Sequence, residues 1–201
     1  ISGDMHLGAM VDLGVPPAHL EAELDKLGLP GWRLRFTRDS RKGIGGTRAD
    51  VLLDGEPDPL APAAGRAEAG QPAAPAFTPV AKLHTPLTPG HEPHEHRNHR
   101  DIVALIERST LPAGTKRRAL AIFARLAEAE AKIHGVPVAE VGFHEVGAVD
   151  SIVDIAAAAI ALEWLKPDRI LVSTIELGGG FVKCAHGRLS VPAPATADLL
   201  R

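Results

Sequence analysis

Residues 143–154 read FHEVGAVDSIVD, and they open an apolar segment that continues to Leu165. The segment 149–165 is hydrophobic on nearly all sides, which predicts a central, buried helix. On such a helix Asp150 and Asp154 lie one turn apart on the same face. An unpartnered buried carboxylate is costly, so Asp154 requires a metal ion, a cationic ligand or a hydrogen-bond donor. The plainer alternative is that Asp150 caps the helix and Asp154 accepts hydrogen bonds from neighbouring backbone.

Around this segment the sequence predicts an α+β fold, in which helices pack on a small sheet. Three parts are expected: an N-terminal α/β segment (1–54), a disordered Pro/Ala-rich linker ending in a histidine cluster (55–99), and a helical/β core (100–201). Helices are predicted over 4–13, 17–27, 101–108, 112–134, 149–165 and after Pro194, and strands over 32–37, 47–53, 170–177 and 181–191. The stripe predicted to face the core from helix 112–134 is Ala119, Ile122, Phe123, Leu126, Ala129 and Ile133.

Composition excludes several classes of function. The net charge of −3 and the aromatic content of 3% argue against a nucleic-acid or anionic-membrane surface. The longest apolar run is too short to cross a bilayer. A single cysteine, Cys184, excludes an internal disulfide and fits a reducing cytoplasm. The chain begins at Ile1 rather than Met and is expected to be a fragment.

A histidine cluster is the first candidate metal-binding feature. Its imidazoles suit a borderline ion such as nickel, zinc or copper, and a flexible tether would make it a capture site. The alternative is a merely polar hinge. The predicted ligands are His91, His94, His96 and His99.

The second candidate set combines imidazole and carboxylates in the opening motif, and its predicted catalytic residues are His144, Glu145, Asp150 and Asp154. Such a set suits a transition metal, Mg or Mn, or general acid–base chemistry. Asp4, at the start of the first predicted helix, is either its cap or a further acidic metal ligand.

A third candidate site lies near the end of the chain. Consecutive glycines allow backbone amides to approach an anion, and a lysine can neutralise it. The predicted anion-binding residues are Gly178, Gly179, Gly180 and Lys183. Cys184 and His186 share one face of an extended chain and form a candidate metal pair. A simple turn and a buried, inert cysteine are the alternatives.

Taken together, these segments resemble the LarC-type nickel insertion proteins. The resemblance rests on ISGDM at 1–5, DLG at 12–14, the His-rich insert, the motif at 143–154, GFVKCAHG at 180–187 and VPAPAT at 191–196. It runs in order along the whole chain except the Pro/Ala linker. Family members are about twice as long, so the chain is expected to be the N-terminal region.

The resemblance implies an enzyme that inserts nickel into pyridinium bisthiocarboxylate mononucleotide, forming nickel–carbon and nickel–sulfur bonds of a nickel-pincer cofactor. It further implies a cytoplasmic, lyase-type cyclometallase that uses CTP with Mn or Mg, bound by the C-terminal half. An acceptor apoenzyme and a homo-oligomer are also expected. In this interpretation the histidine tether passes nickel to the folded site, and Glu145 or His144 removes the ring proton. Two alternatives remain: a nickel metallochaperone or store, and a metal-dependent phosphohydrolase.

Overall fold

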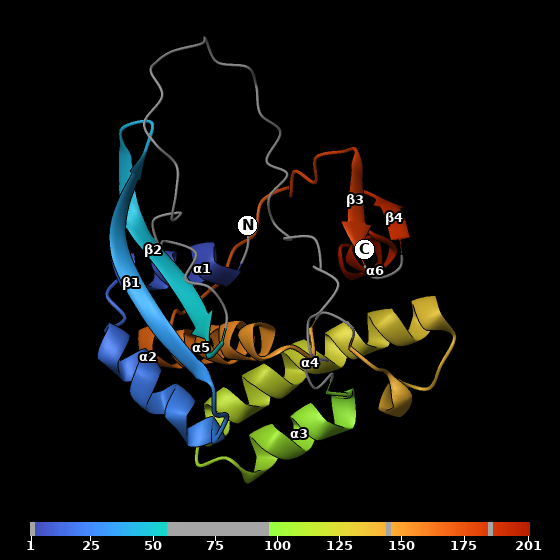
Figure 1. Cartoon of the computed structure of the whole chain (residues 1–201), viewed down its shortest axis with the longest axis horizontal. Coiled ribbons are helices and arrows are strands. Elements are labelled where there is room, and N and C mark those ends of the chain that lie inside the picture. The colour runs from blue at the N-terminus through green and yellow to red at the C-terminus, as the bar shows by residue number, and fades with distance from the viewer. Residues whose placement is uncertain (1–2, 56–96, 144–145, 185–186) are drawn as a thin grey trace.

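The computed structural model describes residues 3–55, 97–143, 146–184 and 187–201 (Figure 1). Within these ranges the chain forms helices around one core and two small antiparallel sheets, which confirms the predicted α+β class. The predicted disorder of the insert falls on residues 56–96, outside the described residues. The elements are α1 (Gly3–Asp12), α2 (Pro17–Leu24), η1 (Asp25–Leu27), β1 (Trp32–Arg41), β2 (Ile44–Leu53), α3 (His99–Arg108), α4 (Ala113–His134), η2 (Val138–Glu140), α5 (Val149–Leu165), β3 (Phe181–Cys184), β4 (Gly187–Ser190) and α6 (Pro194–Leu199).

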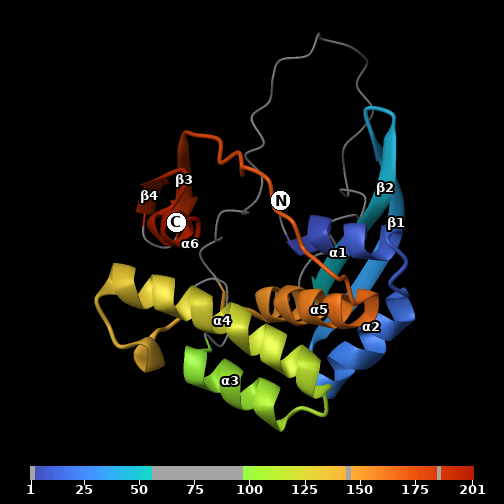
Figure 2. The same ribbon diagram turned by 180° about the vertical axis from the view of Figure 1, so that it is seen from behind.

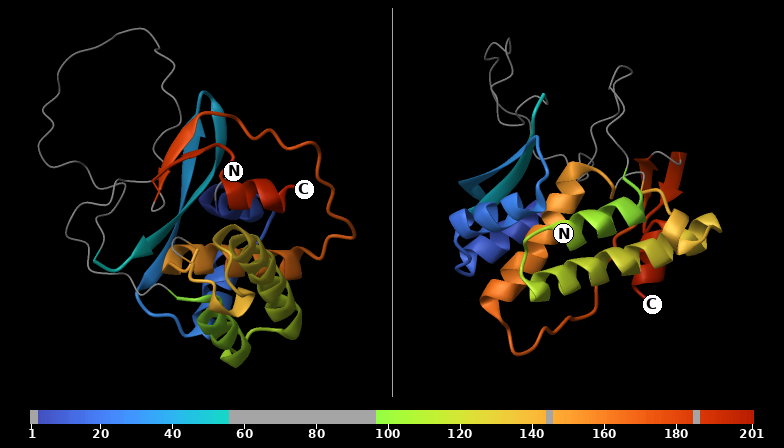
Figure 3. Two further views of the ribbon diagram at one scale, coloured as in Figure 1. Left: turned by 90° about the vertical axis from the view of Figure 1, so that its right-hand side faces the viewer. Right: turned by 90° about the horizontal axis from the view of Figure 1, so that it is seen from below.

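Helix α5 is the centre of the fold, as its all-round apolar sequence predicts. It contacts α1, α2, α4 and β2, so elements from both ends of the described chain cover it. Seen from below in Figure 3, α3 and α4 lie side by side and α5 crosses behind them. Its small alanine positions allow this close approach. The α5 residues buried in this way are Ile152, Val153, Ala156, Ala157, Ala159, Ile160 and Ala161.

The hairpin β1–β2 and helix α1 form the second layer. The two strands pair antiparallel, with Trp32 opposite Leu53 and Arg41 opposite Ile44. Helix α1 packs on β2 and on α5. At its C-terminal end, Asp12 accepts hydrogen bonds from the Thr47 amide (2.9 Å), the Thr47 hydroxyl (2.7 Å) and Arg38 (2.6 Å). The Thr47 hydrogen bonds, with the nearby Arg38 charge, lower the pKa of Asp12, so an ionised carboxylate ties α1 to the sheet.

Helices α3 and α4 close the lower side. Asn98 caps α3 by accepting from the Asp101 amide at 2.9 Å, while the Asp101 carboxylate accepts from the Asn98 amide at 3.2 Å. Gly135 ends α4 in the left-handed conformation, with φ at 66°. A single core cluster spans Leu7 to Ala161, so α1, α2 and the β1–β2 hairpin bury their apolar side chains together with those of α3, α4 and α5. Among the described residues no helix is long and apolar enough to cross a membrane.

Helix α6 packs on the C-terminal part of α4, where Lys132 pairs with Asp198. The hairpin β3–β4 lies beside α6 (Figures 1 and 2). Near the other end of α4, Arg118 pairs with Glu163 of α5. Helix α5 therefore runs antiparallel to α4, and its first turn lies on the side of the molecule where α6 and β3–β4 sit.

Three predictions about elements are wrong in detail. The strand expected over 170–177 does not form, because no neighbouring strand pairs with it among the described residues. The strand expected over 181–191 is split by a turn into β3 and β4. Ile133 is 45% exposed, because the buried face of α4 near its end passes through Ala127 and Ala131 instead.

Candidate functional site

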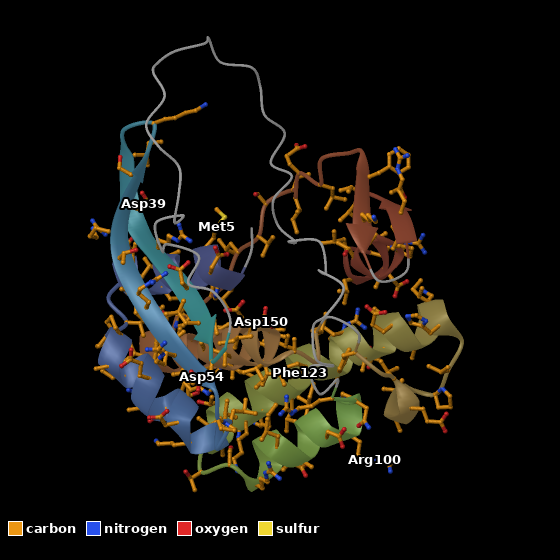
Figure 4. All side chains as sticks on the ribbon, in the orientation of Figure 1. Met5, Asp39, Asp54, Arg100, Phe123 and Asp150 are labelled. Carbon is orange, nitrogen blue, oxygen red and sulfur yellow. The ribbon has the colours of Figure 1, made fainter. Side chains whose placement is uncertain are left out.

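Three carboxylates gather where α1 meets α5. We call Asp4, Asp150 and Asp154 the acidic cluster. Asp150 lies in the first turn of α5 and Asp154 one turn later, as the sequence predicts, while Asp4 lies in the first turn of α1. Figure 4 labels Asp150 and Met5, which mark the beginnings of the two helices. Helices α1 and α5 are far apart in the sequence, but their acidic first turns lie together in the fold.

Close packing of α1 on α5 sets this geometry. Gly3 rests directly on Asp154, and a Cβ atom at this position would overlap the Asp154 carboxylate. Leu7, one turn further along α1, is fully buried. Glycine is therefore needed at position 3 because any larger residue would push the helix away from Asp154. The first-turn amides of α1 also place the positive end of its dipole beside the carboxylate.

Asp154 is the most perturbed group of the cluster. Its Oδ1 atom is buried and has no hydrogen-bond partner among the described residues. Burial, followed by the charges of Asp150 and Asp4, raises its pKa to about 7. Near neutral pH the carboxyl group is therefore close to half protonated. A carboxyl in this condition can release a proton when a cation arrives, or accept one from a reacting group.

Asp150 does not act as the cap of α5. The N-cap residue is Ala148, which has no side-chain cap bond, and Asp150 is the second helical residue. Its side chain is exposed and accepts a hydrogen bond from the Ser151 amide at 2.7 Å. The acidic group is thus placed at the positive end of the α5 dipole with oxygens left for further contacts. The alternative in which Asp154 accepts hydrogen bonds from neighbouring backbone is not supported either, since its buried Oδ1 accepts none among the described residues.

The end of the histidine-rich insert is fixed against the motif that opens α5. A Cβ atom on Gly147 would lie 2.6 Å from the Arg97 carbonyl oxygen and 2.7 Å from that of Phe143. Asn98 bridges to Gly142, and the His99 amide donates to the Val141 carbonyl at 3.1 Å. We call this contact of residues 97–99 with residues 141–143 and Gly147 the insert junction. Arg97, at the end of the histidine segment, therefore packs on Gly147, which lies three residues before Asp150 in the sequence.

Replacing Gly147 with alanine tests the insert junction. Two carbonyl oxygens occupy the space that the new methyl group needs, and both belong to backbone that cannot swing aside. We expect a loss of about 2 kcal/mol in the free energy of unfolding, measured with a chemical denaturant. Gly142→Ala is the matched control, because nothing lies within 4 Å of its Cβ position and its φ is not positive. Equal stability of the two variants would contradict the junction.

His99 is held in the insert junction. Its ring stands edge-on to Phe143, with centroids 6.1 Å apart, and its Nε2 is buried without a hydrogen-bond partner among the described residues. Burial lowers its pKa, which favours the neutral imidazole that metals bind. The metal-binding role of His99 stays a prediction, now with the residue placed beside the motif.

Several predicted site residues lie outside the described residues, and for them the structure gives no placement. They are His91, His94, His96, His144, Glu145, His186 and the side chain of Cys184. Lys183 is exposed on β3, and the glycines at 178–180 lie on an exposed segment before that strand. The described residues contain no group of three or more His, Cys, Asp or Glu side chains arranged to hold a metal ion. A complete ligand set around the acidic cluster would therefore need residues beyond those described.

Sequence reasoning missed two participants. His6 lies one helical turn after Gly3, which places it on the side of α1 that faces the acidic cluster, and burial lowers its pKa. Gly3 itself carries no chemistry, but it permits the contact with Asp154. The spacing of Gly3 and His6, three residues apart at the start of a helix, was the available signal.

Comparison with known proteins identifies the family. The family model described as nickel insertion protein matches residues 1–201. A Geobacillus kaustophilus protein named pyridinium-3,5-bisthiocarboxylic acid mononucleotide nickel insertion protein is 45% identical over 100% of this chain and 42% of its own length. A protein of the same name from Akkermansia muciniphila is 46% identical over 100% of this chain and 43% of its own. The chain thus spans less than half the length of these relatives. No solved structure matches it.

Proposed function

The chain belongs to the nickel insertion protein family, and on that premise we propose that it takes part in placing nickel in pyridinium-3,5-bisthiocarboxylic acid mononucleotide. The product would be a nickel-pincer cofactor. The observation that carries the proposal is Asp154, a half-buried carboxyl group whose pKa is raised to about 7 beside two further carboxylates, and whose buried Oδ1 has no hydrogen-bond partner among the described residues. Nickel is the substrate of this reaction, and the acidic cluster is the proposed place where it is held.

A divalent cation suits the acidic cluster for an electrostatic reason. Three carboxylates repel one another, and the buried Asp154 oxygen has no donor to compensate its charge among the described residues. A cation removes both penalties, so its arrival would release the Asp154 proton. Carboxylates bind nickel less tightly than imidazoles or thiolates do. A carboxylate-rich site would therefore hold the ion loosely enough to pass it to the sulfur atoms of the substrate.

The insert junction supplies the route for the ion. His94 and His96 lie three residues and one residue before Arg97, whose backbone packs on Gly147 at the entrance to α5. We propose that the histidines capture nickel and release it to the acidic cluster. The hand-over would proceed from neutral imidazoles to carboxylates, with His99 in the insert junction between them.

Insertion also requires a proton acceptor. When the nickel–carbon bond forms, the ring carbon loses its hydrogen as a proton, and the electron pair of the C–H bond becomes that of the Ni–C bond. The proposed acceptors are His144 and Glu145, which stand within six residues of Asp150 in the motif. Asp154 would hold the ion. Lys183 and the glycines at 178–180 remain the proposed anchors for the phosphate of the substrate.

CTP and its Mn or Mg do not fit the described residues. The glycines at 178–180 lie on an exposed extended segment rather than at the start of a helix, and Lys183 is exposed beside them. A triphosphate site needs convergent amides and cations. We therefore propose that CTP binds outside residues 1–201. The lyase-type chemistry, the cytoplasmic location and the transfer to an acceptor apoenzyme are likewise proposals for the full-length protein.

Nickel calorimetry on the full-length protein tests the role of the acidic cluster. Binding is measured at pH 7 in two buffers of different ionisation enthalpy, which gives the number of protons released. We expect a folded site that survives deletion of residues 91–96 and disappears in Asp150→Asn/Asp154→Asn. Proton release at that site should fall at pH 8.5, where Asp154 is already ionised.

Asp168→Asn is the matched control, because this carboxylate is exposed and lies outside the cluster. Nickel binding that vanishes with the deletion and is unchanged in the double variant would favour the metallochaperone or storage alternative. Release of phosphate from simple esters without nickel would favour the phosphohydrolase. Either result would overturn the proposed role of the acidic cluster.

A further inference from the structure

The segment that follows α5 exposes an unusual amount of apolar side chain. Five large aliphatic residues within eight positions are between 40% and 80% exposed: Ile170, Leu171, Val172, Ile175 and Leu177. Phe181, at the start of β3, is 66% exposed and continues the patch. Single exposed apolar residues are ordinary, but a contiguous run of this kind marks a surface that another element covers.

The backbone of the same segment pairs with no strand of the described part of the chain. Among the described residues no backbone hydrogen bond joins 167–179 to another segment. Figures 1 and 2 show these residues running from the end of α5 to β3, and the left view of Figure 3 shows them on the outside of the molecule. Unpaired backbone groups beside exposed aliphatic side chains are typical of a segment that forms a strand when a partner strand pairs with it.

The side-chain pattern identifies the kind of sheet. In an extended chain successive side chains point to opposite faces. Ile170 and Val172 therefore share one face, while Leu171, Ile175 and Leu177 share the other. Apolar residues on both faces are typical of an interior strand covered on both sides, and an antiparallel edge strand would alternate with polar residues. β-branched residues at 170, 172 and 175 favour the same conformation.

We propose that residues 169–177 form an interior strand of a sheet whose neighbouring strand comes from the same polypeptide outside residues 1–201. The relatives carry more than half of their length outside the region that this chain matches, which is ample sequence to supply it. A second copy related by two-fold symmetry would pair one edge only, whereas the remaining length of a full-length chain can supply a strand at each edge and elements that cover both faces. The proposed occupant is thus an apolar strand of the full-length chain, and the nickel site does not enter the proposal.

Photo-crosslinking in the full-length protein tests the occupant. A benzophenone amino acid replaces Val172, and the same group replaces Ile44 as a control, because both side chains are more than 70% exposed within residues 1–201. Protein is produced as an equal mixture of 14N- and 15N-labelled chains. We expect isotopically uniform crosslinks from position 172 to peptides outside residues 1–201, and none of these from position 44.

Hydrogen exchange on the unmodified full-length protein provides the second measurement. Amides of residues 169–177 should exchange at least about 100-fold more slowly than an unstructured peptide, independently of protein concentration. Isotopically mixed crosslinks, or protection that grows with concentration, would overturn the proposal in favour of a second copy. Exchange at the unprotected rate, or crosslinks confined to residues 1–201, would overturn it altogether.

Discussion

Asp154→Asn is expected to raise the free energy of unfolding at pH 8 and to lower nickel insertion by at least about 100-fold. The pKa of Asp154 is about 7 in the folded protein and near its ordinary value of 3.8 in an unfolded chain. Between these values the folded state binds more protons, so wild-type stability falls as the pH rises from about 4 to about 7. Asparagine carries no charge and removes this penalty.

The expected gain at pH 8 is roughly 2 to 4 kcal/mol, because partial solvent exposure reduces the full effect of the pKa difference. At pH 4 the two proteins should differ little, since Asp154 is then protonated in the folded protein. Denaturant unfolding at both pH values measures the difference. Asp168→Asn is the control for stability, because its exposed carboxylate lies outside the acidic cluster and should change stability by no more than about 0.5 kcal/mol.

A stable but inactive Asp154→Asn protein would separate the two roles of this residue. Groups that serve chemistry are often destabilising in the folded state, because the fold holds them in an unfavourable environment. If the variant were less stable than the wild type at pH 8, Asp154 would be a hydrogen-bonded structural residue. If it were more stable and fully active, the acidic cluster would not be where nickel is inserted.

Gly8→Ala should lower the free energy of unfolding by about 2 to 4 kcal/mol. Gly8 is buried where α1 crosses β2, and a Cβ atom there would overlap the carbonyl oxygen of Thr47. That oxygen belongs to strand backbone, so either α1 or β2 has to shift. The shift would outweigh the gain of up to about 1 kcal/mol that alanine brings to a helix. Because α1 also carries Gly3 and Asp4, nickel binding at the acidic cluster should weaken together with stability.

The matched control is Gly114→Ala, also within a helix. There the Cβ atom would meet only the carboxylate end of Glu163, which is a flexible side chain near the surface. We expect Gly114→Ala to change stability by less than about 1 kcal/mol in either direction. Thermal or denaturant unfolding monitored by circular dichroism measures the free energy of unfolding of both variants. Equal effects at the two positions would mean that the packing of α1 on β2 is not tight.

Long, strongly patterned elements were predictable from the sequence. The apolar residues on all sides of 149–165 and the helical spacing over 112–134 predicted α5 and α4, and the structure confirms both helices. Gly135 ends α4, as predicted. Errors arose where a partner decides the outcome. Residues 170–177 have strand character but pair with no strand among the described residues. Ile133 fits the helical stripe, but the buried face of α4 near its end passes through Ala127 and Ala131.

In the candidate site, the sequence likewise predicted what lies within one helix but not the contacts between elements. The relation of Asp150 to Asp154 follows from helical geometry and is confirmed. The approach of Asp4 to Asp154 depends on how α1 docks across more than a hundred residues of sequence, which no local pattern encodes. The role of Gly147 was equally hidden, because it depends on the path of Arg97. Sequence periodicity orders residues along one element, whereas a site requires the distances between elements.

The insert junction has a kinetic consequence. Covalent geometry alone keeps the backbone of His94 within roughly 11 Å of Arg97, however the rest of the insert is arranged. In the proposed hand-over, a nickel ion bound by this histidine would meet the start of α5 as a tethered reactant, at an effective concentration in the millimolar range or above. Free nickel would have to reach that level to deliver ions to the site as often. The length and composition of the insert upstream of His94 can thus vary widely without changing the rate of delivery.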